Sequence, residues 1–399
     1  MKLIVVSTNA GLAMGGEAMK ALQYVQELLA QGRDVTLITH ARCRAGLAGL
    51  LPAERVIYIE DSAAMRLCWR LRGLKRLVNP LFHLAVARLI RSFPASEVVV
   101  QYLCPISPVE PRFPPRGYTT VIGPVSGNIF YPEGFRHLDS PTERLHQRIY
   151  RPVQRLMGLM SRQYRQADRV LVSGYARTEE ALTWAGCPRE KMLHVWDAGL
   201  AEDLLSPPRM DPTTSPPAFV WIGRMVALKG VDLAIRALAQ STGQGQLTLY
   251  GDGPERGALE ALAQDLGIAD RVHFAGWLPH ENLRAAMIGH RAFLFPALRE
   301  SNGIIMQEAM AIGLPVVALR WGGPLGLASD AEALFVEPAS PDQVVRDLAQ
   351  AMDRLLAEPD LADRLSRAAR QKAEAEFPWA EVARSWYAAA MAAKHTSPD

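Results

Sequence analysis

Two glutamates, Glu300 and Glu308, stand eight positions apart in "ALRESNGIIMQEAMAIGLPVV". A Ser-Asn-Gly sequence between them breaks the apolar pattern and predicts a turn. The residues of that turn and of the start of the following helical pattern are Ser301, Asn302, Gly303, Ile304 and Ile305. Free N–H groups at a helix start favour an anion, and carboxylates accept hydrogen bonds from hydroxyls. An anion flanked by hydroxyls describes a nucleotide sugar. The alternative is that Glu300 caps the helix and Glu308 is a solvated surface residue.

Two permanent cations follow another strand-like run, in "FVWIGRMVALKGVDLAI". Arg224 and Lys229 are five positions apart, and Gly223 precedes them. A guanidinium offers a planar fork and an ammonium a point charge, so together they can hold a diphosphate. Two solvated surface cations are the alternative.

Glycines mark two further loops where a backbone could approach a phosphate. Gly251 lies in "LYGDGPE", and Gly15 and Gly16 lie in "GLAMGGEAM" just before a helical pattern. The second loop lacks the G-x-G-x-x-G spacing, which argues against a dinucleotide cofactor.

The elements that must position these loops are β-branched runs that alternate with helical patterns in both halves of the chain. Such alternation predicts parallel sheets with helices on both faces, an α/β fold of two Rossmann-like domains. The proline-rich stretch "SPPRMDPTTSPP", residues 206–217, predicts the boundary. We therefore expect an N-terminal domain at 1–205, a C-terminal domain at 206–375 and a C-terminal helix at 376–399 that crosses back to the first domain.

Composition places the chain among ordinary soluble globular proteins. It has 399 residues, of which 49% are hydrophobic, and four cysteines with no metal-type spacing. This favours a reducing compartment and no structural zinc. We expect neither a signal peptide nor a membrane span, and hence a cytoplasmic protein.

Basic residues concentrate in the first half. Residues 62–96 contain seven Lys or Arg and no acid, and residues 143–169 contain seven Arg and two acids, interleaved with apolar residues. This pattern favours attachment to an anionic membrane surface. The alternative is two surface helices with snorkelling arginines. We expect no nucleic-acid binding, because no recognised module is visible. His83, inside the first segment, is expected to be a surface or interface group.

Taken together, the motifs resemble GT-B glycosyltransferases of family 4, which are retaining enzymes. The resemblance rests on Glu-x7-Glu, on "GRMVALKG", on "GDGP" and on "QEAMAIGLPVVA", and it extends weakly through the first half. It implies that Arg224 and Lys229 hold the donor diphosphate and that Glu300 contacts the sugar. It also implies that the amides of Ser301 to Ile305 face the donor and that Glu308 binds the ribose. Trp277 could line the base pocket, although packing explains it equally well.

The sequence departs from the family's pattern near the donor sugar, and it contains no D-x-D, the metal-binding motif of the other large glycosyltransferase fold. Many relatives carry a histidine near the donor sugar where this chain reads "VIGPVSGN", so Ser126 and Asn128 are only loose candidates for the acceptor side. No D-x-D occurs, so we expect no metal, with the fixed cations stabilising the leaving diphosphate. The resemblance implies front-face attack, in which the departing phosphate accepts the acceptor's proton.

The sequence therefore predicts a retaining, metal-independent glycosyltransferase without a cofactor. The donor is expected to be a UDP- or GDP-linked sugar, and the acceptor a polyprenyl-linked or other oligosaccharide in the assembly of a surface polysaccharide. We expect the protein at the inner face of the membrane. A sugar-nucleotide epimerase of the same architecture and a catalytically inactive sugar-nucleotide binding protein are the alternatives.

Overall fold

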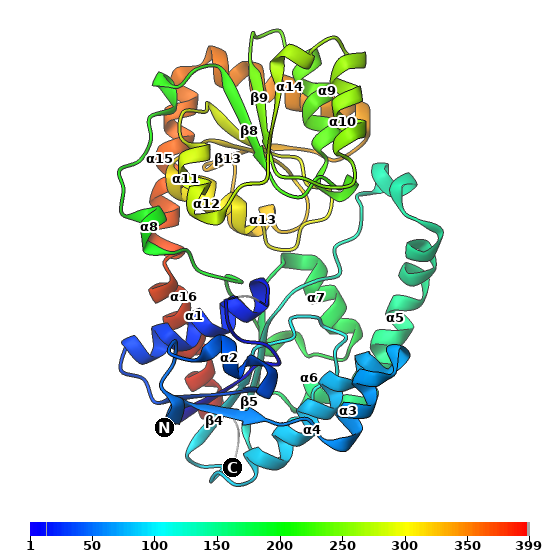
Figure 1. The fold of residues 1–399 in the computed structure, drawn as a ribbon, viewed down its shortest axis with the longest axis vertical. Helices are drawn as coiled ribbons and strands as arrows, with labels where there is room; N and C mark the ends of the chain where they lie inside the picture. The colour runs from blue at the N-terminus through cyan, green and yellow to red at the C-terminus, as the bar shows by residue number, and fades with distance from the viewer. Residues whose placement is uncertain (13, 397–399) are drawn as a thin grey trace. The chain divides into compact units, whose positions relative to one another are not determined.

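The computed structural model describes residues 1–12 and 14–396, and their contacts divide into two units (Figure 1). Unit 1 comprises residues 1–128, 146–199 and those from Trp379 on. Unit 2 comprises residues 129–145 and 200–378. Each unit has its own parallel sheet, so the fold is the expected pair of Rossmann-like α/β domains.

The described part of unit 1 contains a seven-stranded sheet in the order β3-β2-β1-β4-β5-β6-β7. The strands are β1 (Lys2–Val6), β2 (Val35–His40), β3 (Val56–Ile59), β4 (Val98–Tyr102), β5 (Thr119–Val125), β6 (Arg169–Val172) and β7 (Met192–His194). All pairings are parallel. The strand order reverses between β1 and β4, which makes their carboxyl ends the switch point of this sheet.

Helices cover both faces of that sheet because alternate residues of each strand face opposite ways. The helices are α1 (Gly16–Ala30), α2 (Arg44–Leu47), α3 (Ala63–Arg70), α4 (Val78–Ile90), α5 (Pro141–Ser161), α6 (Gln163–Gln166), α7 (Tyr175–Trp184) and α16 (Trp379–Ala392). Leu3 and Val5 of β1 join the core formed with α1 and α16, whereas Ile4 and Val6 join the core formed with α4. Helix α16 thus packs in unit 1, where the rings of Tyr24 and Trp386 meet at 4.9 Å.

Unit 2 repeats the architecture with a six-stranded parallel sheet in the order β10-β9-β8-β11-β12-β13. The strands are β8 (Ala218–Ile222), β9 (Gln246–Tyr250), β10 (Val272–Gly276), β11 (Ala292–Phe295), β12 (Val316–Leu319) and β13 (Ala333–Val336). The order reverses between β8 and β11. The two strands that precede the predicted cation loop and the predicted glutamate loop are therefore neighbours at a switch point.

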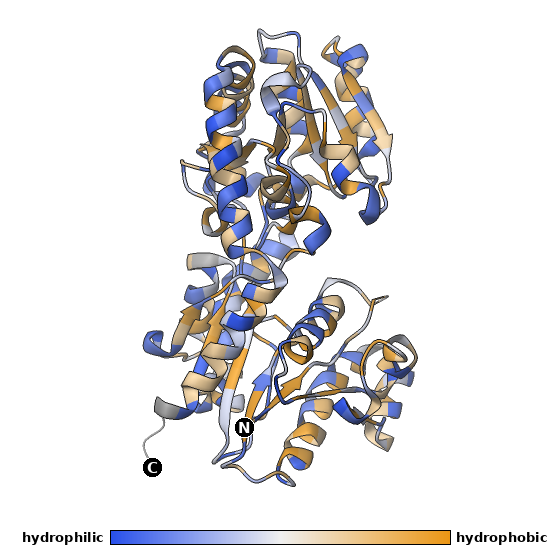
Figure 2. Cartoon of the chain, turned by 90° about the vertical axis from the view of Figure 1, so that its left-hand side faces the viewer, coloured by the Kyte–Doolittle hydropathy of each residue, from blue (hydrophilic) through white to orange (hydrophobic). Residues whose placement is uncertain are grey.

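The helices of unit 2 are α8 (Glu202–Leu205), α9 (Val231–Gln240), α10 (Arg256–Asp265), α11 (Leu283–Met287), α12 (Ile304–Ile312), α13 (Pro324–Leu327), α14 (Pro341–Ala357) and α15 (Pro359–Glu376). Residues of α9, α10 and α14 share one core cluster with Phe219 and Trp221 of β8, whereas α12 packs against α11 and α15. Figure 2 shows the hydrophobic strands inside each unit, with mixed helices around them.

Residues 129–145 differ from the domain range expected from the sequence, because the contacts group them with unit 2. Tyr131 and Phe135 join the core of unit 2, and Arg299 makes several contacts with this segment. Its guanidinium donates to the carbonyl of Ile129 (3.1 Å), pairs with Glu143 (2.5 Å) and lies over the ring of Tyr131 (5.1 Å). The second basic segment, 143–169, is therefore divided between the two units.

The first basic segment, 62–96, has two characters. In α3 and the turn after it, exposed Leu67, Leu71 and Leu74 alternate with exposed cations, whereas α4 is half buried. His83 on α4 is fully buried, so the expectation of a surface group is wrong. Burial lowers the pKa of His83 to about 3, so the imidazole is neutral.

Within the described residues, no helix combines the length and the apolar character needed to cross a bilayer. The four cysteines are buried free thiols.

Candidate active site

The cation loop after β8 and the glutamate loop after β11 contact each other through their backbones. The amides of Leu298 (2.9 Å) and Arg299 (3.2 Å) both donate to the carbonyl of Leu228. A Cβ at Gly230 would collide with the carbonyl of Pro296, so this close approach requires glycine. Adjacent strands and these contacts fix the two loops against each other.

Lys229 and Glu300 form an ion pair across these loops, with 2.5 Å between Nζ and Oε2. Lys229 ends a 3-10 turn (Ala227–Lys229), and both side chains are mostly buried, with 25% and 17% of their surface exposed. The structure thus brings together two of the predicted site residues that lie 71 positions apart. A partly desolvated cation beside a carboxylate can meet a phosphate and a hydroxyl at neighbouring positions.

Arg224 lies on the same loop as Lys229 but is exposed. Within the described residues its guanidinium has neither an ion pair nor a side-chain hydrogen bond. Its donors are therefore available to a ligand.

Gly223 and Gly251 meet where the loops after β8 and β9 cross. Gly251 has φ +128°, and a Cβ there would collide with the carbonyl of Gly223. The Gly223 amide donates to the carbonyl of Tyr250 (3.0 Å). The close packing of the two loops therefore requires glycine at position 251, and a phosphate contact is not needed to explain that residue, whereas a Cβ at Gly223 would meet only the ring of Trp221 at 3.3 Å.

The turn Ser301, Asn302 and Gly303 leads into α12, with Gly303 in the left-handed region at φ +81°. Ile304 and Ile305 are the first helical residues, and the first bond of the helix runs from the Met306 amide to the Gly303 carbonyl (2.8 Å). The helix therefore begins where the sequence predicted it, and its first amides have no hydrogen-bond acceptor within the helix.

Glu308 lies inside α12 and is only 5% exposed, so it is not a solvated surface residue. Its Oε1 is 2.9 Å from Nε2 of His280, which lies in the 3-10 turn His280–Asn282 after β10. The same loop exposes 75% of Trp277, so packing does not explain that residue. Sequence reasoning missed His280, because a lone histidine 28 positions away carries no spacing signal.

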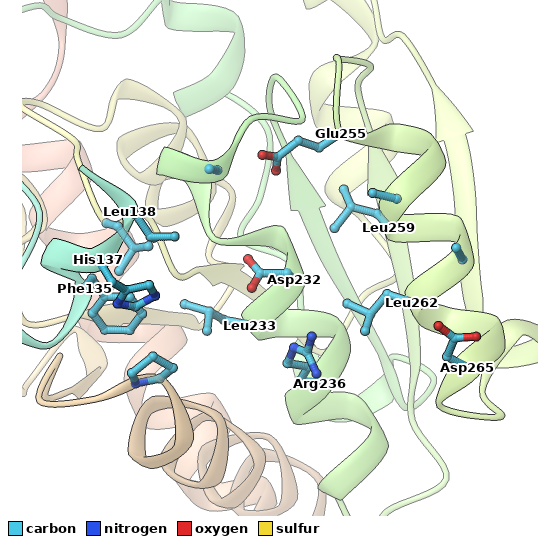
Figure 3. A pocket seen from close by; sticks show the side chains of 15 residues that line it. Phe135, His137, Leu138, Asp232, Leu233, Arg236, Glu255, Leu259, Leu262 and Asp265 are labelled. Atoms are coloured by element: carbon cyan, nitrogen blue, oxygen red, sulfur yellow. The ribbon is translucent and has the colours of Figure 1, made fainter. Parts of the chain in front are cut away.

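A pocket of about 540 Å³ lies beside the cation loop, between α9, α10 and residues 135–138 (Figure 3). The carboxylates of Asp232 and Glu255 face it, and burial raises the pKa of both. Ala227, in the turn that carries Lys229, also lines this pocket. None of the predicted donor-site side chains is among the described residues that line this pocket, so the predicted donor site does not form it.

In unit 1, Gly15 and Gly16 lie at the start of α1, and a Cβ on either would meet no atom within 4 Å. One turn below, Lys20 and Asp197 form a buried ion pair (2.7 Å). Burial raises the pKa of Glu17, which stands between the glycines and this pair. The glycines therefore face open space above a fixed polar cluster.

Among the described residues, no group of three or more His, Cys, Asp or Glu side chains is placed to hold a metal ion. Metal independence remains a prediction.

Comparison with known proteins indicates the class of protein and the fold. Residues 209–372 match the family model "Glycosyl transferases group 1". The lipopolysaccharide core biosynthesis glycosyltransferase LpsE of Rhizobium meliloti is 32% identical over 170 residues, which cover 42% of this chain and 48% of LpsE. Glycogen synthase of Mycobacterium tuberculosis is 30% identical over 250 residues, 59% of each chain. The chain thus spans about half the length of these curated relatives.

The crystal structure of Anabaena HepE in complex with UDP superposes with a TM-score of 0.69 at 17% identity, covering 98% of this chain and all of HepE. The fold is therefore that of the GT-B glycosyltransferases, as the sequence predicted.

Proposed function

We propose that the protein is a retaining glycosyltransferase that moves a sugar from a nucleoside-diphosphate sugar to a polyprenyl-linked or other oligosaccharide acceptor in surface polysaccharide assembly. The observation that carries the proposal is the Lys229–Glu300 pair at the switch point of unit 2, within the segment that matches the glycosyltransferase family model. The relatives include lipopolysaccharide core enzymes, and HepE has been solved with UDP and with UDP-glucose.

In this proposal Lys229 and Arg224 hold the diphosphate, and the first amides of α12 face the donor. Glu300 accepts hydrogen bonds from the donor sugar, and Glu308 accepts them from the ribose. In unit 1, Gly15 and Gly16 leave open space at the start of α1, where a phosphate group of a substrate can approach the backbone. Trp277 is exposed at the end of β10, where it can cover the base.

The reaction proceeds by front-face attack. The acceptor oxygen forms its bond to the anomeric carbon as the bond from that carbon to the phosphate oxygen breaks. The departing phosphate oxygen takes the acceptor's proton, so no side chain needs to act as a base. The protein contributes position and positive charge, and these stabilise the leaving diphosphate as its charge grows.

Turnover should not depend on a divalent metal, because Arg224 and Lys229 already supply the positive charge at the diphosphate. We expect the rate of donor consumption in EDTA to equal the rate in buffer alone. Loss of turnover in EDTA, with recovery on addition of Mg²⁺ or Mn²⁺, would contradict this assignment.

A lipid-linked acceptor fits the exposed surface of unit 1. Cations and large apolar side chains share the outer faces of α3, the turn after it and α5; the apolar ones include Leu67, Trp69, Leu71, Leu74, Leu77, Ile149, Val153, Leu156, Leu159 and Met160. Basic residues near an anionic surface contribute about 1 kcal/mol each, and the apolar residues insert at the interface. We propose that this surface holds the protein at the inner face of the membrane.

Changing Arg70, Lys75 and Arg76 together to glutamine should weaken binding to anionic vesicles about 10²-fold, because three such contacts are worth about 3 kcal/mol. Vesicle flotation at low salt measures the bound fraction. Glutamine at the exposed unit 2 residues Arg346 and Arg364 is the control for charge. If the unchanged protein does not float with anionic vesicles, the surface is only a solvated face.

The donor assignment is tested by titrating UDP, GDP and ADP and their glucose conjugates into the protein while its thermal unfolding is followed. A ligand that binds only the folded state adds about 2.7 kcal/mol at a hundred times its Kd. At least one nucleotide should raise the midpoint, and Arg224→Ala should reduce the shift. No shift with any of them would refute the proposal.

A further inference from the structure

Glu308 is buried within α12, yet the side chain that forms a hydrogen bond with it is exposed. The carboxylate keeps 7% of its surface, whereas His280 keeps 73%, and 2.9 Å separate Oε1 from Nε2. Within the described residues, His280 is the only side-chain partner of Glu308. A ribose that binds Oε1 of Glu308 therefore competes with the imidazole for that oxygen.

The charges around His280 favour its protonated form. Glu308 on α12, Asp203 on α8 and Glu281 beside His280 are all acidic. The hydrogen bond that the His280 imidazole donates to the Glu308 carboxylate is the first cause of the raised pKa of His280. The nearest cation along the chain is Arg284 on α11, and its guanidinium donates to the carbonyl of Pro208 (3.1 Å). The ion pair between His280 and Glu308 is therefore strongest while the imidazole carries its second proton.

We infer that the imidazole of His280 and the ribose of the donor nucleotide compete for the carboxylate of Glu308, so that His280 leaves it when the nucleotide binds. The inference rests on the proposed function, because that function makes Glu308 the ribose ligand. His280 lies in a 3-10 turn of three residues and is mostly exposed, so it can rotate away without opening the core.

The sign of the pH dependence follows from competition between a proton-dependent partner and the ribose. Below the raised pKa of His280, the imidazolium holds the carboxylate and opposes the nucleotide. As pH rises through the pKa of His280, the imidazole loses its charge and competes less strongly with the ribose for Glu308. By linkage, nucleotide binding must release part of a proton from His280.

The test is calorimetric titration with UDP, with GDP and ADP in parallel, between about pH 6 and 8.5, where histidine titrates. Repeating it in two buffers with different ionisation enthalpies gives the number of protons released. Proteins carrying His280→Gln and His273→Gln are compared with the unchanged protein, because His273 is an exposed histidine on neighbouring β10. Proton changes from the nucleotide itself are common to all three proteins.

We expect His280→Gln to bind UDP about two- to fivefold more tightly than the unchanged protein near pH 6, with the difference shrinking toward pH 8.5, as for an exposed ion pair. The proton released by the unchanged protein should be missing in His280→Gln and retained in His273→Gln. Weaker binding by His280→Gln at every pH, or equal proton release by all three proteins, would overturn the inference while leaving the donor site in place. Failure of every nucleotide to bind the unchanged protein would instead refute the proposed function, and the inference with it.

Discussion

Lys229→Ala is expected to lower the rate of donor consumption about 10²-fold or more, with Arg224→Ala lowering it by a similar or smaller factor. Removing one positioned group that stabilises developing charge typically costs 10²- to 10³-fold in rate. Lys229 should have the larger effect, because its removal also leaves Glu300 without a counter-ion at 17% exposure. That carboxylate would then repel the diphosphate.

This reasoning predicts a partial rescue. Adding Glu300→Gln to Lys229→Ala should recover part of the lost UDP affinity, by about three- to tenfold, because an uncompensated, partly buried charge is removed. Turnover should not recover, since the glutamate that contacts the sugar is lost as well.

The control for both cation variants is Arg346→Ala, which removes an exposed cation of α14 far from these loops in sequence. All variants should unfold near the temperature of the unchanged protein. Near-normal turnover by both Lys229→Ala and Arg224→Ala would remove the diphosphate assignment.

Glu308→Gln is expected to weaken UDP binding about 10- to 100-fold, because hydrogen bonds to a charged group are worth about 1.5–3 kcal/mol. The effect should depend on the ribose hydroxyls. With 2′,3′-dideoxy-UDP as the ligand, the unchanged protein and Glu308→Gln should bind with nearly the same Kd.

Asp270→Asn is the matched control, since it changes an exposed carboxylate in the 3-10 turn Ala269–Arg271, which precedes β10. It should leave both titrations nearly unchanged. An equal loss of affinity for UDP and for the dideoxy nucleotide in Glu308→Gln would mean that Glu308 acts on the site through its structure, and not by binding the ribose.

The loops could be predicted from sequence because their signals are local. An apolar run, a Ser-Asn-Gly turn and an apolar helix closed by Gly313 define the segment around Glu300 wherever it folds. The strand and 3-10 turn before Lys229 are equally local. The alternation of such segments then sufficed to predict two parallel sheets.

The pairing of these residues could not be predicted in the same way. Lys229 meets Glu300 only because β8 and β11 are neighbours, and the order of strands in a sheet depends on how all of them pack. The contact between His280 and Glu308 likewise joins separate elements. Residues 129–145 were expected in the first domain. Their contacts with unit 2, through the core around Phe135 and through Arg299, join distant segments that no local pattern marks.

The most direct test of the account is to incubate the protein with UDP-, GDP- and ADP-glucose, with and without a polyprenyl-diphosphate-linked glycan, and to follow the sugar by NMR. The account predicts release of one nucleoside diphosphate that depends on the acceptor, and a product whose new linkage keeps the donor's α configuration. An inverted linkage would contradict the retaining mechanism, and an isomerised free sugar nucleotide formed without acceptor would indicate an epimerase. A donor that binds but is never consumed would make the protein a sugar-nucleotide binding protein and contradict the central claim.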